Sequence, residues 1–156
     1  KSYFYRDGRR FSNGVVYNND SNALTVRDEE EAYAKIAQEL GMQTLKLGYM
    51  PEEMYFQSVV IEDGYGKLQY KYKDNQVSFI QAKANASTSM VHSSDTNAMY
   101  QVRNPELRII FEIYGEAIGE SRMRYETCFT YKGVYYHLFG ELPKKEFEEM
   151  LKKIHL

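Results

Sequence analysis

The sequence predicts an α+β fold, in which an antiparallel meander sheet of five to six strands carries an N-terminal and a C-terminal helix packed on one face. Two observations support this prediction. Between residues 55 and 140, short segments of alternating apolar and polar residues are separated by turn signals, which is typical of hairpins. Amphipathic segments lie before and after this region, and each can lay an apolar stripe on the sheet.

The first 28 residues are expected to be an irregular lead-in or juxtamembrane segment, and residues 29–156 a single α+β domain. The lead-in is polar, and turn signals flank its short apolar run VVY. At 156 residues the chain is long enough for one hydrophobic core. Because the first residue is Lys rather than Met, we expect a further part of the protein upstream of it.

A first helix is predicted at residues 29–40. Asp28 can cap its N-terminus, Glu31 has the position of the acid in a capping box, and Gly41 can end the helix in a left-handed conformation. The apolar stripe consists of Ala32, Ile36 and Leu40. Pro51 then prevents helix from continuing, so the segment GYMPEE is an elbow that directs the chain into the sheet.

Three strands are predicted after the elbow, at 55–62, 67–73 and 76–84, with turns at DGYG and at Asp74-Asn75. In the second strand Leu68, Tyr70 and Tyr72 alternate strictly with polar residues, which indicates one buried and one solvated face. Residues 85–98 are rich in Ser, Thr, Asn and Ala and are expected to form an exposed loop or a ragged edge.

Three more strands are predicted at 107–115, 121–131 and 134–140, the last two joined by a tight turn at Lys132-Gly133. Pro143 then opens the last helix, where its missing N–H costs nothing. The helical spacing of the apolar residues gives this helix one stripe, formed by Phe147, Met150, Leu151 and Ile154.

Composition excludes some functions. A formal net charge of −2 supplies no positive field for a phosphate backbone, so nucleic acid is not an expected partner. One Cys and three scattered His make a zinc site improbable, and we expect no metal and no cofactor. His137, on a predicted strand, is interpreted as a partly buried hydrogen-bonding residue, and Cys128 as a small buried apolar one.

Candidate catalytic residues are few. His92, Ser93 and Asp95 lie close together in VHSSD, but neighbouring side chains on an extended segment point apart, and catalytic triads are assembled from distant parts of a chain. We therefore predict no catalytic residue and no enzyme. A hydrolase that uses Ser93 or Cys128 is kept as the least favoured alternative.

Three segments carry a resemblance to a known family. They are AYAKIAQELG running into LKLGYMPEEMYFQSVVIED, then KLQYKYKDNQVSFIQ, and the ending FTYKGVYYHLFGELPKKEFEEMLKKI. Over roughly residues 29–155 the chain resembles the bacterial domain of unknown function family 4367. The resemblance assigns Gly48, Tyr49 and Pro51 to the elbow and Gly133, Tyr136 and Gly140 to the terminal hairpin, as positions that define the fold. Related sequences often have Gly after the Pro-Glu of the elbow, where this chain has Glu53, so the turn can be of another type.

Many members of such families are the extracytoplasmic part of single-span membrane proteins, some similar to anti-sigma factors. The resemblance therefore implies a non-enzymatic, membrane-anchored sensor or interaction domain outside the cytoplasm, whose only contact with the membrane is a span upstream of this chain. Its partner would be a protein or an envelope component, bound for example by strand addition at an open edge near residues 85–98. The alternative is a lipid or small-molecule carrier with an apolar pocket under the sheet.

Overall fold

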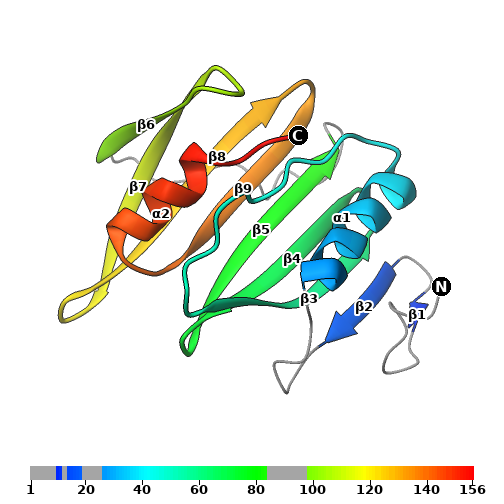
Figure 1. The fold of residues 1–156 in the computed structure, drawn as a ribbon, viewed down its shortest axis with the longest axis horizontal. Helices are drawn as coiled ribbons and strands as arrows, with labels where there is room; N and C mark the ends of the chain where they lie inside the picture. The colour runs from blue at the N-terminus through cyan, green and yellow to red at the C-terminus, as the bar shows by residue number, and fades with distance from the viewer. Residues whose placement is uncertain (1–9, 12–13, 19–25, 84–97) are drawn as a thin grey trace.

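The computed structural model describes residues 10–11, 14–18, 26–83 and 98–156, and Figure 1 shows the arrangement of the elements. The helices are α1 (Val26–Leu40) and α2 (Lys144–Lys152). The strands are β1 (Arg10–Phe11), β2 (Gly14–Asn18), β3 (Met54–Glu62), β4 (Tyr65–Tyr72), β5 (Asn75–Lys83), β6 (Tyr100–Asn104), β7 (Ile109–Gly119), β8 (Arg122–Tyr131) and β9 (Val134–Glu141).

All the strands belong to one antiparallel sheet of nine strands in the order β1-β2-β3-β4-β5-β9-β8-β7-β6. The α+β antiparallel fold is thus confirmed, but the predicted number of five to six strands is wrong, because seven lie between residues 54 and 141. The strand missed is β6, whose short alternation Tyr100–Asn104 is followed at once by Pro105 and resembles a loop in the sequence.

The sheet is also not a single meander. Strands β1 to β5 follow one another across one half, and β6 to β9 follow one another across the other half in the reverse direction. The halves join where β5 pairs with β9, for example Val77 with Gly140 and Phe79 with Leu138. The first strand of the second half, β6, therefore lies at the far edge of the sheet.

The predicted lead-in contributes to the sheet. Its apolar run lies in β2, which pairs with β3 through Val15 and Ile61 and thereby extends the sheet beyond the predicted domain boundary at residue 29. Helix α1 begins at Val26, so Asp28 is the third helical residue and not the cap. At the other end Gly41, with φ +62°, donates its N–H to Ala37 O at 2.9 Å and ends the helix as predicted.

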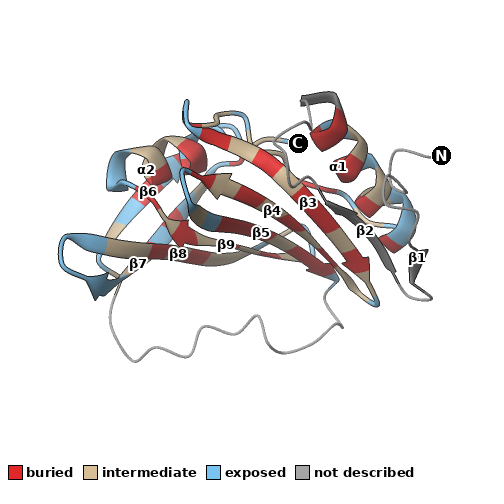
Figure 2. Cartoon of the chain, turned by 90° about the horizontal axis from the view of Figure 1, so that it is seen from below, coloured by how far each residue is buried: buried red, intermediate tan, exposed pale blue. Residues whose placement is uncertain are grey.

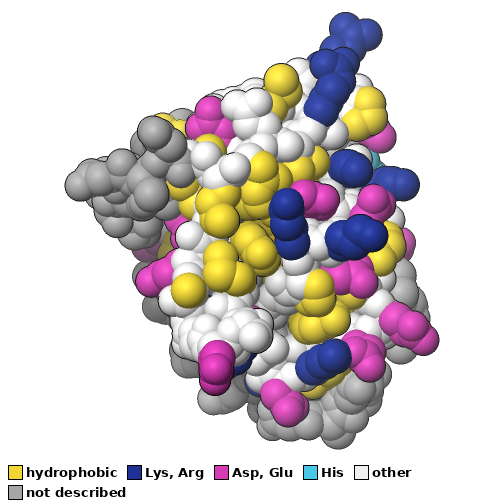
Figure 3. Space-filling model, turned by 90° about the vertical axis from the view of Figure 1, so that its left-hand side faces the viewer, with side chains coloured by type: hydrophobic (Ala, Val, Ile, Leu, Met, Phe, Trp, Pro, Cys, Tyr) yellow, Lys and Arg dark blue, Asp and Glu magenta, His cyan; other side chains and the backbone are white. Residues whose placement is uncertain are grey.

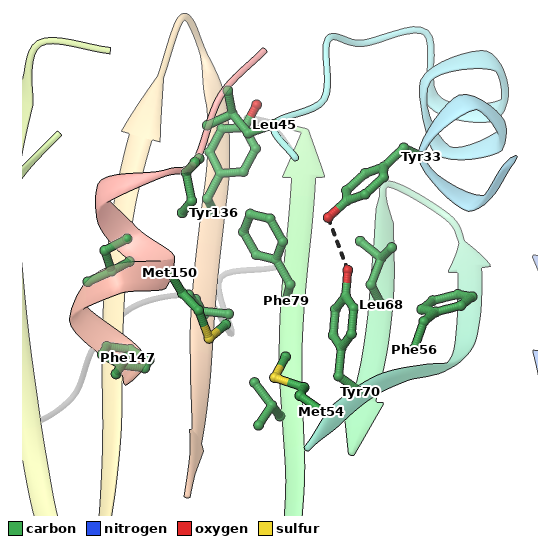
Figure 4. Close-up of a cluster of buried hydrophobic side chains, with 14 of the residues drawn as sticks. Tyr33, Leu45, Met54, Phe56, Leu68, Tyr70, Phe79, Tyr136, Phe147 and Met150 are labelled. Atoms are coloured by element: carbon green, nitrogen blue, oxygen red, sulfur yellow. Dashed lines mark hydrogen bonds between the residues drawn. The ribbon is translucent and has the colours of Figure 1, made fainter. Parts of the chain in front are cut away.

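The two helices lie on the same side of the sheet (Figures 1 and 2). In β4 the predicted alternation holds, since Leu68 and Tyr70 are fully buried beneath α1 and the intervening Lys67 and Gln69 are half-buried. All four residues of the apolar stripe predicted for the last helix are likewise fully buried, but only Phe147, Met150 and Leu151 lie in α2, and Ile154 follows its end at Lys152. The space between helices and sheet is filled by large side chains, as Figure 4 shows.

A buried polar network ties α1 to the sheet. Tyr70 donates its hydroxyl to Glu29 Oε2 at 2.6 Å, and the hydroxyls of Tyr33 and Tyr70 are 3.0 Å apart (Figure 4). Tyr33 Oη also accepts the N–H of Leu47 at 3.0 Å. Burial raises the pKa of Glu29, although the hydroxyls of Tyr70 and Tyr33 act in the opposite direction.

Candidate interaction site at the β6 edge

Strand β6 is the terminal strand of the sheet and pairs only with β7 among the described strands. Val102 is buried, whereas Gln101 and Arg103 on the other face are exposed. The backbone of an edge strand presents N–H and C=O groups on its outer side, and these can pair with an added strand. Tyr100–Asn104 therefore forms the outer edge of the sheet among the described residues, whereas residues 85–97, near which an open edge was expected, lie outside them.

Asn104 fixes the end of this strand. Its side chain is fully buried and forms three hydrogen bonds: Nδ2 donates to Leu151 O at 2.8 Å and Ile154 O at 2.9 Å, and Oδ1 accepts the N–H of Leu107 at 2.8 Å. The carbonyl of Leu151 lies in the last turn of α2, where it also accepts the N–H of Ile154 at 3.4 Å, and the carbonyl of Ile154 lies just beyond the helix. Asn104 therefore connects the β6 edge rigidly to α2.

Apolar side chains flank the edge. Met99, just before β6, and Ile110, opposite Arg103 on β7, are each 56% exposed. Figure 3 views the molecule from the β6 side and shows hydrophobic side chains gathered in the middle of this surface, among acidic and basic ones. Nearby, Lys144 Nζ lies 4.5 Å from the centre of the Tyr100 ring. An exposed strand edge beside large apolar side chains is suited to binding another protein segment.

The elbow residues hold the C-terminal end of the chain. Tyr49 donates its hydroxyl to Glu146 Oε1 on α2 at 2.7 Å. A Cβ at Gly48 would lie 2.4 Å from the carbonyl oxygen of Lys153, so only glycine allows this approach. Buried Pro51 accepts the N–H of Met54 at 3.0 Å, which closes the turn, and Glu53 has no positive φ in it. A turn without a left-handed residue explains why glutamate is accommodated there.

The terminal hairpin residues also have structural contacts. Lys132 and Gly133 have φ values of +51° and +82°, as a two-residue hairpin turn requires. Tyr136 is 1% exposed and donates its hydroxyl to Gln43 O at 3.2 Å. A Cβ at Gly140 would lie 2.8 Å from Val77 Cγ2 and 2.9 Å from its Cα. These contacts position the elbow, the sheet and α2.

A surface cleft of about 470 Å³ opens at the end of the sheet where the β4–β5 and β7–β8 turns meet the start of α2. Its aromatic lining includes Tyr72 and Tyr125, and its charged lining includes Lys73 and Lys144. Arg122 and Glu141 form a bidentate ion pair in the same wall, with Nε–Oε2 and Nη2–Oε1 distances of 2.6 and 2.9 Å. This pairing lowers the pKa of Glu141.

On the face of the sheet opposite the helices, the structure brings together three residues that sequence analysis did not connect. Glu126 and Cys128 on β8 and His137 on β9 place one ligating atom each within 4.8 Å of one another. Cys128 is half-buried rather than fully buried, and burial raises the pKa of its thiol to about 12. Such a thiol is almost wholly protonated at neutral pH and is a weak nucleophile. The cross-strand pairing of Cys128 with His137 could not be read from spacing along one segment.

His92, Ser93 and Asp95 lie outside the described residues. His155, near the C-terminus, exchanges backbone hydrogen bonds with Lys46 and lies beside the elbow glycine, Gly48.

In the described ranges, neither helix has the length and apolarity that crossing a bilayer requires.

Comparison with protein-family models finds a match over residues 44–154, to the family described as Domain of unknown function (DUF4367). The match covers well over half of the chain and includes the elbow, the sheet from β3 onwards and α2. Comparisons with curated proteins and with solved structures found no match.

Proposed function

Given that this chain belongs to the family described as Domain of unknown function (DUF4367), we propose that it is a non-enzymatic interaction domain that binds an extended segment of a partner protein along the outer edge of β6. The observation that carries the proposal is that, among the described strands, β6 has no partner on its outer side, and that Met99 and Ile110 are exposed near it. Backbone hydrogen bonds would supply affinity, and these side chains would select apolar residues in the partner.

The rigidity of the edge supports this role. Asn104 fixes β6 to the end of α2, and buried Val102 packs into the core, so the strand is already ordered before a partner arrives. Preorganisation reduces the entropy lost on binding. The short strand and its exposed Arg103 also limit nonspecific pairing between copies of the chain.

The proposal further assigns the chain to the extracytoplasmic side of a single-span membrane protein, anchored by a span upstream of this chain, with a sensory role like that of anti-sigma factors. The support for this location is the family resemblance, since the geometry of the chain carries no information about its compartment. A reporter fusion tests the location: alkaline phosphatase joined to the C-terminus of the full-length protein should be active, whereas the corresponding fluorescent-protein fusion exported by the general secretion route should be dark. The opposite pattern would contradict the location without affecting the β6 proposal.

A peptide-display selection against the purified chain tests the edge itself. Selected peptides should bind the wild type, and the Met99→Lys and Ile110→Lys variants should bind them about 10- to 100-fold more weakly, because burying a large apolar side chain contributes about 1.5–3 kcal/mol. Ile118→Lys is the matched control, since Ile118 is 38% exposed but lies near the far end of β7. Equal affinity of all four proteins would refute binding at β6.

The cleft favours a second candidate, a lipid or small-molecule carrier. Its volume of about 470 Å³ is that of a ligand pocket, and it combines Tyr72 and Tyr125 with basic Lys73 and Lys144. This lining suits an anionic molecule with an apolar body. The cleft lies at the end of the sheet, whereas the pocket was expected under the sheet. Native mass spectrometry of the chain after incubation with a cell-envelope extract tests it: a bound small mass that Lys73→Glu removes would support the carrier, and a bare protein mass would contradict it.

A further inference from the structure

Glu126, Cys128 and His137 form a compact group on the face of the sheet opposite the helices. Their chain neighbours Thr127 and Leu138 are fully buried and point toward the helix side, so the three residues point the other way. Cys128 lies directly opposite His137 in the β8–β9 ladder. Glu126 is the diagonal neighbour, with its Oε1 atom 3.9 Å from His137 Nε2.

The geometry is close to that of a metal site. The three ligating atoms lie within 4.8 Å of one another. In a tetrahedral zinc site, with bonds of about 2.0–2.3 Å, ligand atoms are about 3.3–3.8 Å apart. Rotations of the side chains can close a difference of roughly 1 Å, because all three are attached to paired strands whose backbones need not move.

The donor set selects the ion. Thiolate sulfur, imidazole nitrogen and carboxylate oxygen together suit a borderline-soft divalent ion and are a poor set for Mg²⁺ or Ca²⁺. We propose that Glu126, Cys128 and His137 bind Zn²⁺ and leave its fourth position to water or to a group from a partner. On binding, the thiol proton of Cys128 is released to solvent and a Zn–S bond forms. Structural zinc sites have four protein ligands, whereas a site with three protein ligands keeps one position open for water or another group.

The surroundings favour a defined site. The side chains of Glu126 and His137 are only 17% and 16% exposed. The ring of Phe139 lies 4.5 Å from that of His137 and restricts its orientation. Arg124 Nη1 is 3.4 Å from Glu126 Oε1 and 3.8 Å from Glu116 Oε1, so the guanidinium can turn toward Glu116 when Glu126 binds a metal.

This inference departs from the expectation of no metal. That expectation considered ligands that recur along one segment, whereas here the imidazole comes from the adjacent strand. The inference is independent of the β6 proposal, because the group lies on the face of β8 and β9 and β6 is separated from β8 by β7. Failure of either proposal leaves the other standing.

Cobalt absorption spectroscopy tests the site, with the untagged chain titrated with Co²⁺ and then with competing Zn²⁺. We expect one Co²⁺ per chain, a sulfur-to-cobalt charge-transfer band that Cys128→Ser abolishes, and loss of the band when Zn²⁺ is added. Glu126→Gln and His137→Gln should each weaken binding at least about tenfold. Circular dichroism of every variant establishes whether it is folded. If His137→Gln does not fold, the test rests on Glu126→Gln, which preserves the size of the side chain.

Two control variants identify the imidazole. His155→Gln and His92→Gln should leave the affinity for Co²⁺ unchanged, and a loss in either would overturn the assignment of His137.

Arg124→Gln should bind Zn²⁺ more tightly than the wild type by a few-fold, because the guanidinium competes with the ion for Glu126. Absence of a charge-transfer band in the wild type, or equal affinity in the wild type, Glu126→Gln and His137→Gln, would refute the site.

Discussion

Replacing Asn104 with alanine should destabilise the chain more than any exposed substitution in β6. The change removes the buried hydrogen bonds to Leu151 O, Ile154 O and the N–H of Leu107. Each bond contributes a net free energy of about 1 kcal/mol, and a buried partner left unsatisfied costs a similar amount or more. We therefore expect the free energy of unfolding to fall by about 3 kcal/mol and Tm by about 6–12 °C.

The assay is urea unfolding followed by circular dichroism, with Gln101→Ala as the matched control on the same strand. Gln101 is exposed, so its substitution should change the free energy of unfolding by less than about 0.5 kcal/mol. Asn104→Asp provides a second check, because it keeps the acceptor for Leu107 but directs a carboxylate at two carbonyl oxygens. The loss in its free energy of unfolding should become smaller at acid pH, where the carboxylate is protonated. A loss below about 1 kcal/mol in Asn104→Ala, or one equal to that in Gln101→Ala, would refute the reasoning.

Two further predictions concern the core. Gly140→Ala should lower the free energy of unfolding by about 1–3 kcal/mol, because its Cβ would lie 2.8 Å from Val77 Cγ2. Gly119→Ala is the control, since its Cβ would have no contact closer than 3.5 Å, and it should change the free energy of unfolding by less than about 0.5 kcal/mol. Equal losses of stability in the two variants, measured by thermal denaturation, would contradict this prediction. The folded-state pKa of Glu29 is raised above its usual 4.5, so the wild type should lose stability as pH rises from that value through the folded pKa. Glu29→Gln lacks this loss, and its stability relative to the wild type should increase between pH 4 and pH 7; a constant difference in urea unfolding across that interval would show that Glu29 is not the responsible group.

Local features of the fold were predictable because they depend on neighbouring residues. The spacing of Phe147, Met150 and Leu151 identified the buried stripe of α2, and the alternation in 67–73 identified the faces of β4. Gly41 and the Lys132-Gly133 turn have the positive φ values that their positions require. In each case the physical cause acts within one helical turn or one hairpin.

Features that depend on distant segments could not be predicted in this way. The pairing of β5 with β9 joins Val77 to Gly140, and no periodicity in either strand specifies that partner. The role of Asn104 was equally unpredictable, because in the sequence it resembles a turn residue. Its side chain is buried and hydrogen-bonded only because α2 lies beside it. The proximity of Cys128 and His137 likewise follows from the strand register and not from their spacing.

Hydrogen–deuterium exchange of the chain, with and without a display-selected peptide, tests whether β6 is the binding edge. We expect backbone amides in Tyr100–Asn104 to gain protection when the peptide binds, since an added strand hydrogen-bonds to the outer side of β6. Protection confined to the cleft residues Tyr72 to Asn75, with exchange in β6 unchanged, would contradict it and favour the carrier.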